Sequence, residues 1–310
     1  MHAPARGSAT FTPADTALLL TLGSMWGLSF LFIELGLRGL GPVSIVAGRT
    51  FIGATVLLVA VAFRRQRTPR SWRWWGHVAV LGVLSNAVPW TAVAAAQRAI
   101  PSGLAALLMA LVPSSTFLVA ASLRMERVTA ARIAGLAMAL AGVGIIVAPD
   151  LGDRGRVLAV VTVVAATVLY AGGAVYAKRY VSGTAAPLMI ATGQVLTAFL
   201  AALPMALVIE GVPTRAALRA DVLGAVAALG VFGTGLAYLV FYLLIARVGA
   251  TNTTLTTYLI PLVAVVAGAL FLGERLGAPA LAGGVAIVLG IWLAQRRAPG
   301  PVEQLERLKT

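Results

Sequence analysis

Arg49 is the residue in this sequence whose position most clearly calls for a chemical explanation. It lies in GRTFIGATVLL, about seven residues into an apolar stretch, which places it on the order of 10 Å below the surface if that stretch is a membrane helix. A charge at that depth is costly and by default indicates function. One interpretation is that Arg49 faces a cavity and binds a carboxylate. The alternatives are a structural ion pair with Glu34 and snorkelling of the side chain to the surface.

Other polar and aromatic side chains also occur deep within apolar stretches. Each of them alone is better explained by packing or by interhelical hydrogen bonding than by contact with a substrate. Together they outline the lining of a site. Besides Arg49, the candidate substrate-binding residues are Trp26, Ser29, Asn86, Tyr170, Gln194, Thr257 and Tyr258.

The same inventory argues against enzyme chemistry. His2 and His77 are the only histidines, no HExxH or nucleotide-binding GxxxxGK[ST] motif occurs, and the chain has no cysteine. We therefore expect no catalytic residue, metal or cofactor, and no direct use of ATP. The charged rings and carbonyl filters that select ions in channels are missing as well.

The composition of the chain indicates that the candidate residues lie on membrane-spanning helices. Sixty per cent of the 310 residues are hydrophobic and only 11% are charged, against about 25% charged in an average soluble domain. A bilayer core about 30 Å thick needs about 20 apolar residues per helix. The sequence predicts an all-α integral membrane protein with ten transmembrane helices, at 15–36, 42–63, 74–96, 101–123, 130–148, 157–177, 186–208, 220–245, 250–272 and 277–295.

The net charge of +14 indicates membrane orientation rather than binding to nucleic acid. Most basic residues fall in loops on the side that also carries both termini, which the positive-inside rule assigns to the cytoplasm. Trp72, Trp74 and Trp75 lie beside the densest basic loop, as in an interfacial anchor belt. We expect a monomeric, multi-pass protein of the bacterial inner membrane, with the lipid bilayer and a small molecule as its partners.

The second half of the chain repeats the first at an offset of 148 residues, as from Glu126 to Glu274. This divides the chain into a cytoplasmic segment 1–14, two five-helix repeats at 15–148 and 149–297, and a tail 298–310. Because five is odd, the second repeat must cross the membrane in the opposite sense. Inverted repeats of this kind are common in secondary transporters, whose substrate site lies between the halves.

Two pairs of repeat-related residues are candidates for gating. Pro113 and Pro261 interrupt spans in matching positions of the two halves, where each frees a carbonyl and permits a kink. Trp90 aligns with Tyr238, and counting along their spans places the two rings at opposite ends of the path. We expect Trp90 to close the outer end and Tyr238 the inner end, with ordinary packing as the alternative.

These features resemble a known group. WGLSFLF in the first span, GRTFIGATVLL in the second, and a proline-containing span followed by Glu and a Gly-rich span in each half resemble the drug/metabolite transporter superfamily, specifically its EamA-type members. In that group a Gly-Glu pair commonly follows the proline-containing span. GER at 273–275 fits this pattern, whereas the first half departs from it, with Met125 in place of the glycine before Glu126. Within that group the chain looks most like bacterial exporters of amino acids, including aromatic ones.

The expected function is therefore secondary transport by alternating access. The resemblance implies small metabolites as substrates, most of all amino acids, moved in the export direction. Since no unpaired acid is evident at mid-depth, facilitated diffusion or exchange is favoured over proton coupling. The alternatives are transport of other amphipathic drugs or metabolites, a channel, and a membrane-embedded enzyme.

Overall fold

The computed structural model describes residues 12–126 and 128–295, and every regular element within them is helical. The expected terminal segments 1–14 and 298–310 lie outside the described residues, apart from residues 12–14. The elements are α1 (Pro13–Leu37), α2 (Pro42–Phe63), α3 (Trp72–Gly82), η1 (Val83–Ala87), α4 (Val88–Ala96), α5 (Ser102–Met109), α6 (Val112–Ser122), α7 (Ala130–Val147), η2 (Ala148–Asp150), α8 (Arg154–Tyr176), η3 (Ala177–Val181), α9 (Pro187–Ile209), η4 (Arg215–Leu218), α10 (Ala220–Gly230), η5 (Val231–Leu236), α11 (Ala237–Thr253), α12 (Thr256–Leu272) and α13 (Ala278–Gln295).

These elements form the ten spans that the sequence predicts. Within the described ranges, nine helical stretches are long and apolar enough to cross a membrane, and α12 is a shorter apolar helix. Several spans are composite: α3, η1 and α4 form one from Trp72 to Ala96, and α10, η5 and α11 form another from Ala220 to Gly249. The chain is thus an all-α, multi-pass membrane protein.

Irregular turns recur at matching places in the two halves. The π-helical segment η1 begins at Val83, and η5 begins at Val231, which is 148 residues further along the chain. The fourth span of each half is also interrupted, at residues 110–111 between α5 and α6 in the first half and at residues 254–255 before α12 in the second, although these two breaks are not equivalent at the offset of 148 residues. Single π-turns and broken helices often mark functional sites. The repeat therefore extends to backbone irregularities that sequence comparison alone does not reveal.

The packing of α7 against α13 shows how the two halves are related. A Cβ atom added to Gly142 would lie 2.5 Å from the carbonyl oxygen of Gly283, and one added to Gly135 would lie 2.4 Å from that of Gly290. Gly283 and Gly290 are the repeat equivalents of Gly135 and Gly142, so the contact is self-complementary, as across a two-fold axis. Since numbering rises along one helix as it falls along the other, the helices are antiparallel. This arrangement is that of an inverted repeat.

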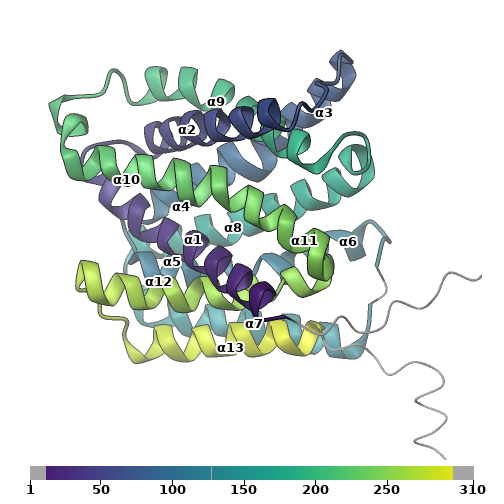
Figure 1. Ribbon diagram of the computed structural model, residues 1–310. Coiled ribbons are helices and arrows are strands. Elements are labelled where there is room, and N and C mark those ends of the chain that lie inside the picture. Colours follow the sequence, from purple (N-terminus) through teal and green to yellow (C-terminus); the bar gives the residue numbers. More distant parts are fainter. Residues whose placement is uncertain (1–11, 127, 296–310) are drawn as a thin grey trace, which may run out of the picture.

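Figure 1 shows the resulting arrangement. α7 and α13 lie along one edge of the bundle, and α2 and α9 lie along the opposite edge. Between them, α1 crosses and packs against α12, α10 and α11, while α8 packs against α4 and α6. The helices that carry Trp26, Tyr170 and Tyr238 therefore lie between these two edges.

Candidate functional site

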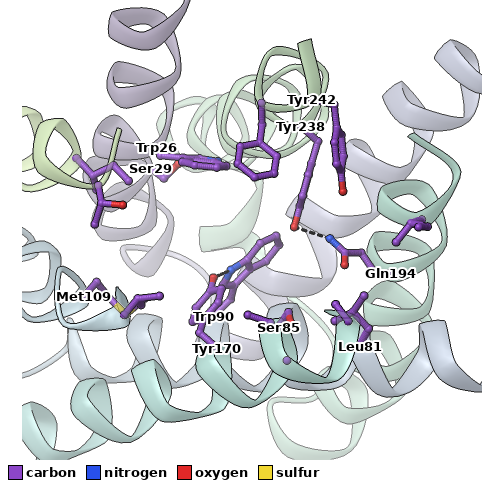
Figure 2. A pocket seen from close by; sticks show the side chains of 18 of the residues that line it. Trp26, Ser29, Leu81, Ser85, Trp90, Met109, Tyr170, Gln194, Tyr238 and Tyr242 are labelled. Atoms are coloured by element: carbon purple, nitrogen blue, oxygen red, sulfur yellow. Dashed lines mark hydrogen bonds between the residues drawn. The ribbon is translucent and has the colours of Figure 1, made fainter. Parts of the chain in front are cut away.

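A cavity of about 710 Å³ lies at the centre of the bundle. Its walls come from both repeats, chiefly from α1, α4, α8, α9, α11 and α12, with Arg49 from α2, and Figure 2 shows many of the side chains. Among the described residues, α7 and α13 contribute nothing to the lining. Cavities of this size fit a small organic ligand. Helices α7 and α13 are supporting elements, as their small and aliphatic side chains suggest.

Arg49 is a charged side chain of this cavity and is almost completely buried, at 5% exposed. Its guanidinium carbon lies 3.7 Å from the centroid of a Trp90 ring, a cation–π contact. Its Nε donates to the Thr234 hydroxyl at 3.2 Å, and its Nη2 donates to the Gly233 carbonyl at 3.4 Å. These contacts fix the guanidinium in place without neutralising its charge.

Within the described residues, no carboxylate forms an ion pair with Arg49. The structural pair with Glu34 that the sequence allowed is therefore not formed. The acceptors that Arg49 does use lie in η5, where the π-helical turn carries Gly233 and Thr234 into the buried space facing α2. Because the Arg49 side chain is buried inside the protein, it does not extend to the membrane surface as a snorkelling side chain would. Arg49 makes its side-chain hydrogen bonds through Nε and Nη2, and the N–H groups of a guanidinium can also bind carboxylates.

Two tyrosines lie beside the Arg49–Trp90 pair. The Trp90 indole N–H donates to the Tyr170 hydroxyl. The Tyr238 hydroxyl accepts from Gln194 Nε2 at 2.8 Å and from Asn86 Nδ2 at 3.1 Å, and Figure 2 draws its contact with Gln194. Polar groups of α4, α8, α9, η1 and α11 are thereby joined around the cation.

The rest of the wall is apolar and largely aromatic. Trp26 packs against Phe241 with ring centroids 5.4 Å apart, and Phe241 packs against Tyr242 at 5.3 Å. Figure 2 shows Trp26, Tyr238 and Tyr242 along one side of the pocket, facing Trp90 and Tyr170. Such surfaces favour the ring or alkyl part of an amphipathic ligand.

Most of the substrate-binding candidates meet in this cavity. Its lining includes Trp26, Ser29, Arg49, Tyr170, Gln194 and Thr257. Asn86 lies behind the wall, fully buried, where it holds the Tyr238 hydroxyl. Tyr258 does not reach the lining, because its hydroxyl donates to Gln295 of α13 at 2.9 Å. The adjacent residues Thr257 and Tyr258 lie on different faces of α12, so only one of them can line the site.

The expected arrangement of the gating rings differs from the structure. Tyr238 packs against the same apolar cluster that contains Trp90, and Figure 2 shows the two rings close together. They do not lie at opposite ends of the path. The span from Ala220 runs to Gly249, beyond the predicted end at 245, so Tyr238 lies nearer its middle than counting suggested. Of the two prolines, Pro261 lines the cavity and Pro113 does not.

Two carboxylates outside the cavity lining accept hydrogen bonds from the N-termini of helices. The Glu210 carboxylate accepts from the N–H groups of Val43 and Ser44, both at 2.9 Å, at the start of α2. The Glu274 carboxylate accepts from Ser102 and Gly103, at 2.7 and 3.0 Å, at the start of α5.

Successive spans alternate in direction, so both of these carboxylate contacts are on one side of the membrane. The exposed loop at Ser182 and Gly183, which contributes to the lining, is on the other side. Because these lining residues are exposed, the cavity is accessible from the side of this loop.

A family model for EamA-like transporters matches residues 16–148 and, a second time, residues 157–295. The chain belongs to the EamA-like transporter family. Each matched segment contains five of the ten spans, in agreement with the repeat. Membership of this family indicates a transporter rather than an enzyme.

The relatives of this EamA-like transporter span nearly its whole length. An "Uncharacterized transporter" of Archaeoglobus fulgidus is 25% identical, over 90% of this chain and 98% of its own. A "Probable terminal-alkyne amino-acid exporter" of Streptantibioticus cattleyicolor is 28% identical, over 92% and 94%. A "Probable amino-acid metabolite efflux pump" of Escherichia coli is 24% identical, over 90% and 94%.

One solved crystal structure superposes with a TM-score of 0.63 at 21% identity, covering 91% of this chain and 97% of that chain. At this identity the likeness concerns the fold alone. It agrees with the helical architecture described above.

Sequence reasoning missed several residues of the site. Phe30, Met109 and Phe241 line the cavity, yet apolar residues at these positions look the same as residues that face lipid. Gly233 and Thr234 were missed because nothing local in the sequence marks a π-turn. The one available signal was the alignment of the two repeats, which places Ser85 of η1 opposite Gly233 of η5.

Proposed function

We propose that this EamA-like transporter exports small carboxylate-bearing metabolites, most of all amino acids with aromatic or other apolar side chains, across the inner membrane. The observation that carries the proposal is Arg49, a buried cation without a carboxylate partner among the described residues, held within an aromatic cavity. The substrate carboxylate would supply the missing charge, and the aromatic wall would pack against its side chain. The printed names of two relatives, an amino-acid exporter and an amino-acid metabolite efflux pump, agree with this class.

We propose that the cavity opens alternately to the two sides of the membrane as two inverted repeats, residues 15–148 and 149–297, move against each other. The cavity is open beside Ser182 and Gly183. The basic residues Lys178 and Arg179 precede this loop, so the positive-inside rule assigns it to the cytoplasm, together with both termini. We therefore interpret the structure as an inward-open state, ready to load a cytoplasmic substrate.

Closure of the opposite side is attributed to the contacts of Glu210 and Glu274 with helix N-termini. Rocking of one repeat against the other would break these contacts and close the cytoplasmic side. Because the cavity lies within one chain, a monomer suffices for the cycle. Trp90 and Tyr238 then act near the centre, where they could close over a bound substrate, rather than at two separate gates.

Counterflow in proteoliposomes tests the proposal. Vesicles loaded with unlabelled phenylalanine should accumulate labelled phenylalanine faster than protein-free vesicles, and an inward or outward pH gradient should change the rate little if transport is exchange. Competition by a panel of amino acids ranks the substrates. If no amino acid or aromatic carboxylate in the panel competes, the substrate assignment is wrong.

A further inference from the structure

Two prolines leave two backbone carbonyls without their regular hydrogen-bond donors. Pro113 lies in the first turn of α6 and Pro261 lies inside α12. Proline has no N–H, so the carbonyl four residues earlier loses the bond it would accept in a continuous helix. These carbonyls belong to Met109 and Thr257.

Met109 and Thr257 are repeat equivalents, one from each half, at the same offset of 148 residues that relates the two prolines. Both residues line the central cavity. Figure 2 shows Met109 across the pocket from Gln194, on the far side of the Trp90–Tyr170 pair.

At the break between α5 and α6, the backbone carbonyl of Met109 differs from the carbonyls that precede it. The carbonyls of Ala106, Leu107 and Leu108 accept hydrogen bonds from Ala110 or Leu111. The donor that a regular helix would supply to Met109 is Pro113, which has none. A carbonyl in an apolar wall gains considerably from a ligand that can donate to it.

The cavity also lacks the usual partner for a positive charge. None of the described residues that line it is Asp or Glu. A free amino acid entering the cavity brings an ammonium group with its carboxylate, and an ammonium without acceptors in an apolar site is strongly disfavoured. In other membrane transporters, carbonyls of broken helices near the midplane coordinate cations.

We propose that the carbonyl oxygens of Met109 and Thr257 form a binding site for a small monovalent cation, and that this cation is the substrate's own ammonium group. The inference rests on the proposed function in one respect, that Arg49 takes the carboxylate of the same molecule. The two charged ends of a zwitterion are then held by separate parts of the cavity. Because each half of the protein supplies one carbonyl, a bound ammonium links the two repeats.

Alanine substitution of the prolines tests this site. Pro113→Ala and Pro261→Ala each supply an N–H that can bond to the carbonyl of Met109 or Thr257 and so compete with the ligand. Pro204→Ala is the matched control, because Pro204 also lies inside a helix, α9, but is exposed and absent from the lining.

The probes are phenylalanine, 3-phenylpropionate, which lacks the ammonium, and phenethylamine, which lacks the carboxylate. Binding is measured on purified protein by competition against labelled phenylalanine and by tryptophan fluorescence. We expect each cavity proline variant to bind phenylalanine and phenethylamine about tenfold more weakly, as for loss of a hydrogen bond to a charged group. Binding of 3-phenylpropionate should stay unchanged, and Pro204→Ala should match the wild type for all three probes.

Equal weakening for all three probes would overturn the proposal, since the prolines would then only shape the cavity. Unchanged binding of phenethylamine would overturn it as well. Phenethylamine has no carboxylate, so its binding tests the carbonyl site independently of Arg49. 3-Phenylpropionate has no ammonium, so an error in the carboxylate assignment would affect the result for 3-phenylpropionate alone.

A measurement on the wild-type protein covers the case in which a variant does not fold. Phenylalanine should bind about tenfold more tightly than 3-phenylpropionate, and equal affinity contradicts the site. Replacing sodium by choline should leave phenylalanine binding unchanged. Sodium-dependent binding that the proline variants abolish would assign the site to Na⁺ instead and overturn the ammonium assignment.

Discussion

Replacement of Arg49 by alanine should separate recognition of the carboxylate from stability of the fold. Hydrogen bonds between charged groups contribute about 1.5–3 kcal/mol each, which corresponds to a loss of about 10- to 150-fold in affinity for a carboxylate ligand. The same substitution removes a cation–π contact of about 0.5–2 kcal/mol with Trp90 and a hydrogen bond of about 1 kcal/mol with Thr234. It also removes a buried, unpaired charge, whose desolvation costs several kcal/mol. These contributions oppose each other, so stability should change far less than binding.

The assay compares 3-phenylpropionate with phenethylamine on wild type, Arg49→Ala and Arg49→Lys. Only the carboxylate ligand should lose affinity in Arg49→Ala, and phenethylamine should bind as well or better once the buried cation is gone. Arg49→Lys should be intermediate, because an ammonium keeps the charge but lacks the planar fork that stacks on Trp90. Thr234→Val keeps the arginine and removes one of its acceptors, and should cost only a few-fold. Parallel losses for both ligands in Arg49→Ala would refute the assignment and indicate a structural arginine.

Three other predictions concern packing, closure and topology. Gly142→Ala should lower the thermal unfolding temperature of detergent-purified protein, because its Cβ meets the Gly283 backbone and overpacking costs about 1–3 kcal/mol; Gly144→Ala on the same helix faces open space and should be neutral or mildly stabilising. Glu274→Gln should lower that temperature by weakening two charge-assisted hydrogen bonds, whereas Glu126→Gln removes only an exposed pair and should have little effect. A reporter that works only in the cytoplasm, fused after Arg297, should be active; an inactive reporter in well-expressed protein would reverse the assigned orientation.

The architecture could be predicted from sequence because it depends on length and composition. Ten apolar stretches and an offset of 148 residues are sufficient to predict the helices and the repeat, and the charge of Arg49 within an apolar stretch indicates a residue of the central cavity. The membrane restricts its spans to helices, so few alternatives remained.

The details of the site could not be predicted in the same way. Trp90 and Tyr238 meet in one cluster because helix tilt and span length decide depth, and neither can be read from residue counts. Tyr258 bonds to Gln295 while its neighbour Thr257 lines the cavity. In a helix that is apolar on every side, periodicity cannot distinguish the face toward a cavity from the face toward lipid.

Blocking the cavity tests most directly whether substrate passes through it. The chain has no cysteine, so Ala174→Cys places a single thiol at an exposed position of the lining, and Ser122→Cys places one at an exposed position outside it. Labelling with a bulky maleimide should abolish phenylalanine counterflow in Ala174→Cys proteoliposomes, and excess substrate should slow the labelling. Labelled Ser122→Cys should transport normally. Undiminished counterflow through fully labelled Ala174→Cys protein would contradict the central claim that this cavity is the transport site.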